Sequence, residues 1–125
     1  MEIRSGEVQC LSHYLADRGI GPGSRVGLLT ENHPRWGIAF LAIQSAGAIV
    51  VPLDVMHDAD TLAYLTGHAE CELLFSSEKM LSKLEEVEER LDGRIPVILS
   101  GNSDGRYPEW DEILEKEEDS SADVP

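Results

Sequence analysis

An apolar segment, residues 36–53, constrains the fold of this chain more than any other feature of its sequence. Its first part is hydrophobic on nearly all sides, which favours a helix that is largely buried. Gly47 follows, and the residue past a helix end often needs the left-handed backbone that glycine adopts easily. Residues 48–51 are a continuous apolar run without polar alternation, which predicts a strand covered on both faces, as in a parallel sheet. Pro52 is expected to end this strand, so helix, turn and central strand form one unit.

The same segment approaches the length of a membrane-spanning helix, which needs about 20 apolar residues. However, Gln44, Ser45, Gly47 and Pro52 interrupt it, and its composition changes from helical to β-branched at the glycine. We therefore interpret the segment as part of a packed core rather than as a membrane span.

The other residues alternate between helical periodicity and short apolar runs. In chain order we expect a helix over residues 5–18, a strand over 25–30, a helix over 34–46, the strand over 48–52, a helix from about 60, a strand over 72–75, a helix that follows Ser76 or Ser77 as its N-cap and ends at Gly93, and a strand over 95–99. This alternation predicts an α/β fold of three layers, with a mainly parallel sheet of about four strands and helices on both faces. The strand order 2-1-3-4 is our prediction for the sheet.

Polar residues before two of these helices are candidate N-caps. Asn32 or His33 precedes the second helix, where Pro34 suits the first turn because its missing N–H is not needed there. Asp58 or Asp60 is expected to cap the third helix in the same way.

The chain divides into an α/β part, residues 1–101, and a different C-terminal part, residues 102–125. The second part begins with a turn-rich loop, and a short helix is expected to pack against the body through Trp110, Ile113 and Leu114. From Glu115 onward the sequence is acidic and poor in apolar residues, which predicts a linker that leads to a remainder absent from this chain.

The charge of the chain excludes one class of partner. There are 10 Lys and Arg against 24 Asp and Glu, a net charge of −14, and most of the acidic excess lies in the second half. Such a chain repels phosphate backbones and anionic lipid, so we expect no nucleic-acid partner. Cys10 and Cys71 lack CxxC spacing and no leader peptide opens the chain, which predicts two reduced thiols and a cytoplasmic protein.

Ligands of open α/β sheets bind at the carboxyl ends of strands, where the loops here begin at Thr30, Asp54, Ser76 and Ser100. The first of these loops has no glycine, so it cannot be a GxGxxG dinucleotide site, and a Gly-Lys-Ser/Thr phosphate loop is absent throughout. The sequence also has no GxSxG nucleophile elbow. We therefore predict no catalytic and no cofactor-binding residue in this chain.

A metal site is not expected either. His57, Asp58 and Asp60 lie close together in sequence, but their spacing matches no standard set of ligands, and an aspartate beside a helix start is usually a cap. We therefore predict no metal-binding residue.

The alternative function is that of a free-standing module, either a receiver-like one that accepts a phosphoryl group on Asp54 or a binding module. The segment VPLDVM resembles the phospho-acceptor strand end of receiver domains, and IPVILSG resembles a later strand of that family. Against it, the first strand ends in Thr30 without an acidic pair for Mg²⁺, and the chain opens with a helix. In addition, no lysine follows the fourth strand before Lys116.

Three ordered segments resemble the N-terminal region of AMP-forming acyl-CoA synthetases, of the adenylate-forming enzyme superfamily. Residues 19–43 resemble that family's "G-x-x-x-G-D-R-V" strand with "E-N-x-P-E-W", and residues 45–54, SAGAIVVPLD, match its "K-A-G-A-x-x-V-P-L-D" motif. Residues 57–77 resemble the helix and strand that follow. RSGEV near the start is a weak echo of the motif "T-Y-x-E-L". The segment ENHPRWGIAFLAI is similar to long-chain fatty acyl members.

The resemblance implies a parent ligase that joins a carboxylic acid, here a fatty acid, to CoA through an acyl-adenylate, using ATP and Mg²⁺. The family's phosphate loop, acyl pocket and C-terminal lysine would all follow the end of this chain, so no catalytic residue of the family maps onto it. The chain is therefore expected to be an inactive scaffold fragment. Trp36 and Phe40 are expected to be left partly bare and to favour self-association.

Overall fold

The computed structural model describes residues 5–30, 34–91 and 95–122. In chain order the elements are α1 (Ser5–Asp17), β1 (Arg25–Leu28), α2 (Pro34–Ser45), β2 (Ile49–Pro52), α3 (Ala59–His68), β3 (Leu73–Ser77), the 3₁₀ turn η1 (Glu78–Met80), α4 (Leu81–Leu91), β4 (Val97–Ser100) and α5 (Trp110–Ala122). The eight elements predicted before residue 100 are all present. The candidate caps Asn32 and His33, and Gly93, lie outside the described residues.

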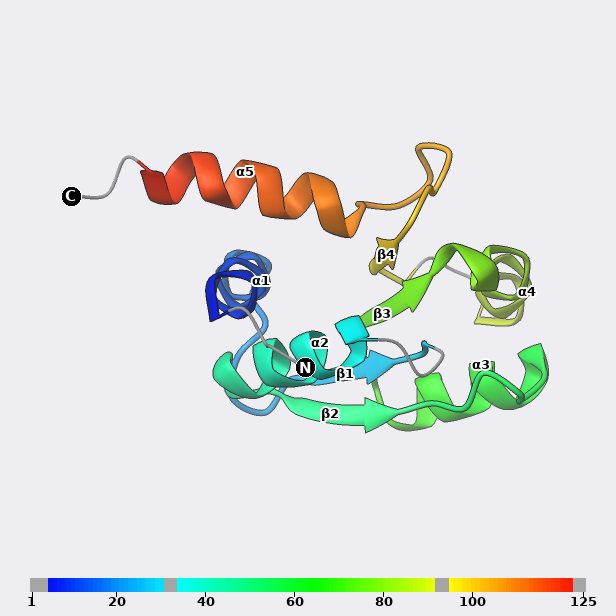
Figure 1. Ribbon diagram of the computed structural model, residues 1–125. Helices are drawn as coiled ribbons and strands as arrows, with labels where there is room; N and C mark the ends of the chain where they lie inside the picture. Colours follow the sequence, from blue (N-terminus) through cyan, green and yellow to red (C-terminus); the bar gives the residue numbers. More distant parts are fainter. Residues whose placement is uncertain (1–4, 31–33, 92–94, 123–125) are drawn as a thin grey trace.

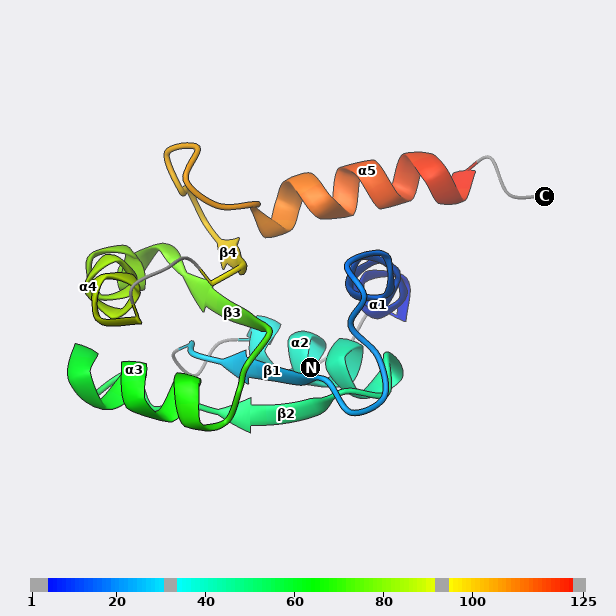
Figure 2. The same ribbon diagram turned by 180° about the vertical axis from the view of Figure 1, so that it is seen from behind.

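The four strands form one parallel sheet in the order β2-β1-β3-β4, which confirms the predicted order. Val26 of β1 lies beside Val50 on one side and Leu73 on the other. Helices α1, α2 and α5 cover one face of the sheet, whereas α3 and α4 cover the other (Figure 1, Figure 2). The predicted three-layer α/β fold is therefore confirmed.

The switch of faces follows from the order of the strands. The crossover from β1 to β2 runs through α2 on one face, and the crossover from β2 back past β1 to β3 runs through α3 on the other. Because the two crossovers travel in opposite directions across the sheet, placing their helices on opposite faces gives both the same hand. The chain thus changes direction between β1 and β3, where doubly wound sheets form their ligand crevices.

Two apolar clusters fill the space between these layers. The first joins α1, α2 and α5 to the sheet and includes Leu11, Leu15, Ile43 and Phe75, with Trp110 packed edge-on against Phe75. The second joins α3 and α4 to the opposite face: Leu53, Leu62, Leu74, Met80, Leu84, Val87 and Leu99. Burial of these side chains is the main driving force for the fold.

The predicted central strand is at the edge of the sheet instead. Among the described residues β2 pairs only with β1, and Ile49 is 51% exposed while Val50 and Val51 are half-buried. The expectation that residues 48–51 are covered on both faces was therefore wrong. A β-branched run reports strand propensity, but it does not report the number of neighbouring strands.

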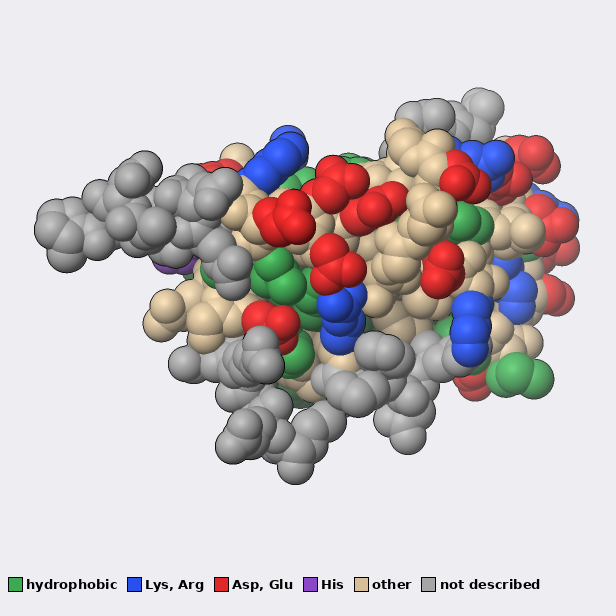
Figure 3. All heavy atoms as spheres, turned by 45° about the horizontal axis from the view of Figure 1, so that its top comes forward, with side chains coloured by type: hydrophobic (Ala, Val, Ile, Leu, Met, Phe, Trp, Pro, Cys, Tyr) green, Lys and Arg blue, Asp and Glu red, His purple; other side chains and the backbone are tan. Residues whose placement is uncertain are grey.

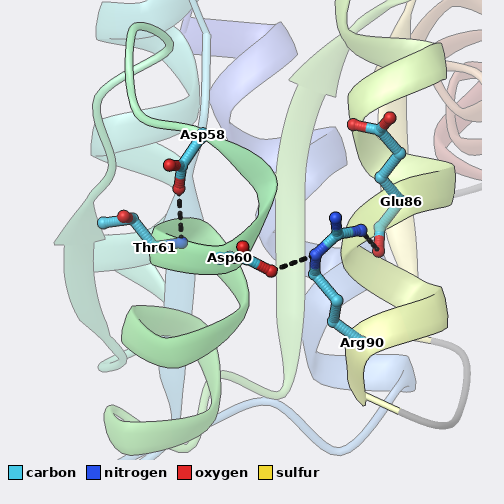
Figure 4. A network of polar contacts seen from close by, with 5 residues as sticks. All are labelled: Asp58, Asp60, Thr61, Glu86 and Arg90. Atoms are coloured by element: carbon cyan, nitrogen blue, oxygen red, sulfur yellow. Dashed lines mark hydrogen bonds and ion pairs between the residues drawn. The ribbon is translucent and has the colours of Figure 1, made fainter.

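Backbone geometry at two helix ends agrees with the sequence. Gly47, just past α2, has φ of +82°, the left-handed conformation expected there. Asp58 is the N-cap of α3 and accepts a hydrogen bond from the Thr61 N–H at 2.8 Å. The other candidate cap, Asp60, pairs with Arg90 and so links α3 to α4 (Figure 4). The Arg90 Nη1 also donates to the Glu86 carbonyl within α4.

The C-terminal helix is longer than predicted. α5 runs from Trp110 to Ala122, so the acidic segment from Glu115, interpreted as a linker, is helical as far as Ala122. Glu and Lys are good helix formers, and the buried Trp110 and Ile113 anchor the first turn, so the helix continues past its apolar residues. Acidic side chains spread over the face made by α5, the preceding loop and α4 (Figure 3). Within the described residues, no helix is both long and apolar enough to span a membrane.

Candidate functional site at the carboxyl edge of the sheet

A pocket of about 180 Å³ lies at the carboxyl ends of β1, β3 and β4. Parallel strands present these ends at one edge, and the change of chain direction between β1 and β3 keeps the helices there apart. The residues lining it are Thr30, Arg35, Trp36, Ala39, Ser76, Ser77, Glu78, Lys79, Ser100, Gly101 and Trp110. Three of the four loops singled out in the sequence thus contribute to one site.

The fourth loop does not contribute. Asp54 follows the edge strand β2, is exposed, and accepts a hydrogen bond from the Met56 N–H at 2.8 Å within its own turn. A receiver domain needs its acceptor aspartate in an acidic cluster, and the described residues contain no group of three or more His, Cys, Asp or Glu placed to bind a metal. The geometry therefore does not favour the receiver alternative.

Three polar side-chain atoms at the pocket are buried without a hydrogen-bond partner in the described structure. They are the Thr30 Oγ1, the Ser77 Oγ and the Trp110 Nε1. Trp110 is only 2% exposed, so its indole N–H is removed from bulk water. A buried donor without a partner costs about 1–3 kcal/mol, so each of these atoms requires a physical explanation.

Ser76 differs from its neighbour. Its buried hydroxyl donates to the Leu29 carbonyl at 2.7 Å and so ties β3 to the end of β1. Ser77 occupies the N-cap position of η1, but its side chain makes no capping hydrogen bond. Ser77 therefore stands at the predicted cap position, but neither serine makes a capping hydrogen bond with its side chain.

Arg35, at the start of α2, lines the pocket and contacts residues of β4 and α5. Its Nη1 donates to the Ser100 Oγ at 3.1 Å, and its Nη2 contacts the Asp111 Oδ1 at 2.6 Å. The guanidinium carbon lies 5.1 Å from the centre of the Trp110 ring, a cation–π distance. These contacts connect α2, β4 and α5 across the carboxyl edge.

Glu78 brings a carboxylate to the same rim. Its side chain packs on Gly101, where an added Cβ would lie 2.8 Å from the Glu78 Cδ, and its Oε2 is 3.4 Å from the Asn102 N–H. Gly101 has φ of +113°, so glycine is required there both for conformation and for space. The carboxylate is thus directed toward the loop after β4.

Arg35 and Trp110 were missed as site residues by sequence reasoning. Arg35 stood in a segment interpreted only as the first turn of a helix, and Trp110 was expected only to hold α5 against the body. The available signal was a charged residue in the first turn of the helix that follows the first strand. Their contact joins residues far apart in the sequence, which no local pattern reveals.

Two larger hollows, of about 400 and 540 Å³, lie between α1 and the loop before α5. They share the lining residues Tyr14, Arg18, Arg106, Tyr107 and Pro108. None of the unpartnered buried side-chain atoms found in the described residues belongs to either lining. The smaller pocket at the carboxyl edge is therefore the better candidate site.

The residues near His57 hold no metal-type arrangement in the described structure. Asp58 caps α3 and Asp60 pairs with Arg90, so both carboxylates already have partners.

The two cysteines do not form a disulfide. Cys10 and Cys71 are half-buried, and burial raises the pKa of the Cys71 thiol. A high thiol pKa makes Cys71 a poor nucleophile.

The match to known families decides the identity of the fold. The family model described as "AMP-binding enzyme" matches residues 5–124. This chain belongs to that family. The match confirms the predicted resemblance to adenylate-forming enzymes, which rested on three ordered motifs.

Similarity to individual proteins of the AMP-binding family is spread over several types. A linear gramicidin synthase protein of Brevibacillus parabrevis is 38% identical over 76 residues, 61% of this chain and 2% of that protein. Long-chain-fatty-acid--CoA ligase 1 of Cavia porcellus is 30% identical over 101 residues, 78% of this chain and 14% of that protein. The structure of the luciferase-like enzyme from the Zophobas morio mealworm superposes with a TM-score of 0.81 at 20% identity, covering 87% of this chain and 25% of that one. This AMP-binding family member therefore spans only a small part of each.

Proposed function

We propose that this chain is the N-terminal α/β part of an AMP-forming acyl-CoA ligase. The reaction of the whole ligase would join a carboxylic acid to CoA through an acyl-adenylate and release AMP and pyrophosphate. The observation that carries the proposal is the family match over residues 5–124. The name of the ligase from Cavia porcellus, which contains a matching segment, supports a fatty acid as the substrate.

ATP, Mg²⁺ and CoA are the cofactors that this proposal implies for the whole ligase. The described residues do not fit an ATP–Mg²⁺ site, because they provide no glycine-rich phosphate loop and no cluster of metal-binding carboxylates. The role proposed for this chain is therefore that of a framework. Its sheet and helices position the remainder of the enzyme, and the catalytic groups belong to that remainder.

The test of the framework role is ATP–pyrophosphate exchange with the purified chain. Long-chain, medium-chain, aromatic and amino acids serve as substrates, because the matched proteins include both a fatty-acid ligase and a gramicidin synthase. We expect exchange at the level of the protein-free blank with every acid. Exchange that depends on both acid and protein would show that this chain carries its own catalytic groups.

A second measurement distinguishes the ligase from the receiver alternative. Acetyl phosphate with Mg²⁺ should leave the mass of the chain unchanged, because Asp54 lies outside the pocket and its carboxylate is used in a turn. A mass increase of one phosphoryl group that is lost in Asp54→Asn would support the receiver.

The ligase proposal also predicts the sequence that follows this chain. Sequencing the gene beyond residue 125 should find a Ser/Thr/Gly-rich loop that ends in Lys-Gly.

A further inference from the structure

A hollow of about 400 Å³ lies at the amino ends of β3 and β4, at the edge of the sheet opposite to the carboxyl-edge pocket. The end of α1 and the loop before α5 form its sides. This loop covers the outer edge of β4 near the end of the strand, where the Leu99 N–H donates to the Pro108 carbonyl at 2.9 Å. The start of β4 is left beside the hollow, which we call the amino-edge hollow.

The wall of the amino-edge hollow is mostly apolar. Six of its residues are aliphatic or proline: Ile20, Leu73, Ile95, Pro96, Val97 and Ile98. Binding sites for small molecules are concave, have volumes of roughly 300–1,000 Å³, and are lined mainly by apolar side chains with a few polar groups. The amino-edge hollow has these properties, so we expect an occupant with an apolar body.

The loop side of the hollow is held in place from α4. Arg106 pairs with Glu85, and the Tyr107 hydroxyl donates to Glu88. The Ser103 hydroxyl donates to the Tyr107 carbonyl at 2.8 Å and so closes the loop on itself. The hollow is therefore formed before a ligand binds, and the charge of Arg106 is already balanced by Glu85.

Arg18 supplies a positive charge at this site. It follows α1, and it lines both the amino-edge hollow and the neighbouring hollow of about 540 Å³. Its guanidinium carbon lies 4.6 Å from the centre of the Tyr14 ring, and within the described structure no carboxylate lies within ion-pair distance of it. Stacking on an aromatic ring orients a guanidinium without using its N–H groups, so these remain available to an acceptor.

The charges nearby favour one side of Arg18 for an anion. Glu72 is the acidic residue in the described lining of the amino-edge hollow. The neighbouring hollow is lined by three acidic residues and one further lysine: Asp17, Glu109, Glu112 and Lys116. An anion is therefore repelled less on the side of the amino-edge hollow, where Glu72 alone opposes it.

We propose that the amino-edge hollow binds an apolar carboxylic acid in its anionic form. The body of the ligand lies against the apolar wall, and its carboxylate accepts hydrogen bonds from Arg18. The planar guanidinium can donate to both oxygens of one carboxylate at once. The net charge of −14 disfavours an anionic membrane surface as the source of the carboxylate, so the ligand is a free molecule. The site lies away from the carboxyl edge, and the proposal does not depend on the ligase reaction.

Octanoate is the probe, and isoleucine methyl resonances of the carbon-13-labelled chain are the readout. Ile20 and Ile95 line the hollow, whereas Ile43 is buried in the core outside it. We expect saturable shifts at Ile20 and Ile95, and none at Ile43, when octanoate is added at constant ionic strength. Acetate has the carboxylate without the body, and octyltrimethylammonium has the body with the opposite charge. Neither should produce a saturable shift.

Charge variants locate the carboxylate. Arg18→Gln should weaken octanoate binding about tenfold, as expected for loss of a hydrogen bond between charged groups. Glu72→Gln should strengthen it about twofold, because it removes an exposed like charge. Arg25→Gln is the matched control, since Arg25 donates to the Ala69 carbonyl and lies outside the lining of the hollow. It should bind octanoate like the unmodified chain.

Each result decides the proposal. Weaker binding in Arg18→Gln together with stronger binding in Glu72→Gln would confirm that the carboxylate lies beside both side chains. Absence of a saturable shift with octanoate would overturn the proposal. Equal shifts with octyltrimethylammonium would overturn it too, because the apolar wall would then act without Arg18. Equal weakening in Arg18→Gln and Arg25→Gln would have the same consequence, since loss of net positive charge would explain both.

Discussion

Asp58 has extended backbone one position before α3, and its carboxylate accepts the Thr61 N–H. The hydrogen bond from this backbone N–H, and then one from the Thr61 side chain, lower the pKa of Asp58 from its ordinary 3.8. Both interactions favour the charged form. Sequence alone left Asp58 and Asp60 as equal candidates, because both lie at the predicted start of the helix. What separates them is that α3 begins at Ala59, so Asp60 lies within its first turn, where it pairs with Arg90 of α4.

The cap predicts a pH dependence of stability. Because the folded pKa of Asp58 is lowered, its contribution is complete above the unfolded value near 3.8 and is lost as the pH falls through the folded value. Asp58→Asn keeps an acceptor for the Thr61 N–H but does not titrate. Urea midpoints of the unmodified chain should therefore fall more steeply below pH 3.8 than those of Asp58→Asn.

Asp58→Ala is the companion variant. It removes the acceptor altogether, so its urea midpoint at neutral pH should lie below the midpoints of both the unmodified chain and Asp58→Asn. Parallel pH profiles for the unmodified chain and Asp58→Asn would count against the titration. An unchanged midpoint in Asp58→Ala would count against the cap.

At the scale of elements, β1 has little space on the face toward α3. A Cβ at Gly27 would lie 2.3 Å from the Leu74 Cδ2 and 3.1 Å from the Leu53 Cδ1, both buried. A Cβ added at Gly37, within α2, would have no atom within 4 Å. Glycine is therefore required by packing in the strand, whereas in the helix it only adds conformational freedom.

This contrast predicts opposite effects of one substitution. Gly27→Ala should lower the free energy of unfolding by about 1–3 kcal/mol through overpacking. Gly37→Ala should raise it by up to about 1 kcal/mol through helix propensity. Urea unfolding followed by circular dichroism measures both. A neutral Gly27→Ala would mean that Leu74 moves aside without cost.

The elements also show which features periodicity can predict. Helix and strand positions up to residue 100 followed from apolar spacing, because burial imposes it locally. The exposed edge at Ile49 did not follow, since it depends on which strands pair with β2. The length of α5 was also missed: a charged sequence was interpreted as disordered, although anchored by Trp110 it is helical.

At the scale of the molecule, strand order brings distant residues together at one edge. The sequence indicated three of the loops that form the pocket, because the carboxyl ends of parallel strands share an edge. It did not indicate Arg35 and Trp110 as a pair, since their contact requires α5 to return across the face covered by α1 and α2. The unpartnered indole N–H likewise becomes visible only once its surroundings are known.

Exposed aromatic surface supports the prediction of self-association. Trp36 is 38% exposed and stacks on the half-buried Phe40 at 5.3 Å between ring centres. Sedimentation velocity should show association that rises with protein concentration and with ionic strength, because salt screens the net charge of −14. Trp36→Gln should reduce this association. Tyr64→Gln, which changes an exposed aromatic residue on α3 on the opposite side of the sheet, should leave it unchanged. A monomer at every concentration would refute this prediction.

The two apolar clusters differ in the length of chain that each requires. The cluster beneath α3 and α4 is made from residues 29–99, whereas the cluster beneath α1 and α2 is completed by Trp110 and Ile113. During synthesis, α2 and the first strands can therefore cover much of the apolar side of α1 before α5 emerges. That cluster is completed only when Trp110 and Ile113 arrive, whereas the opposite half of the domain can close earlier.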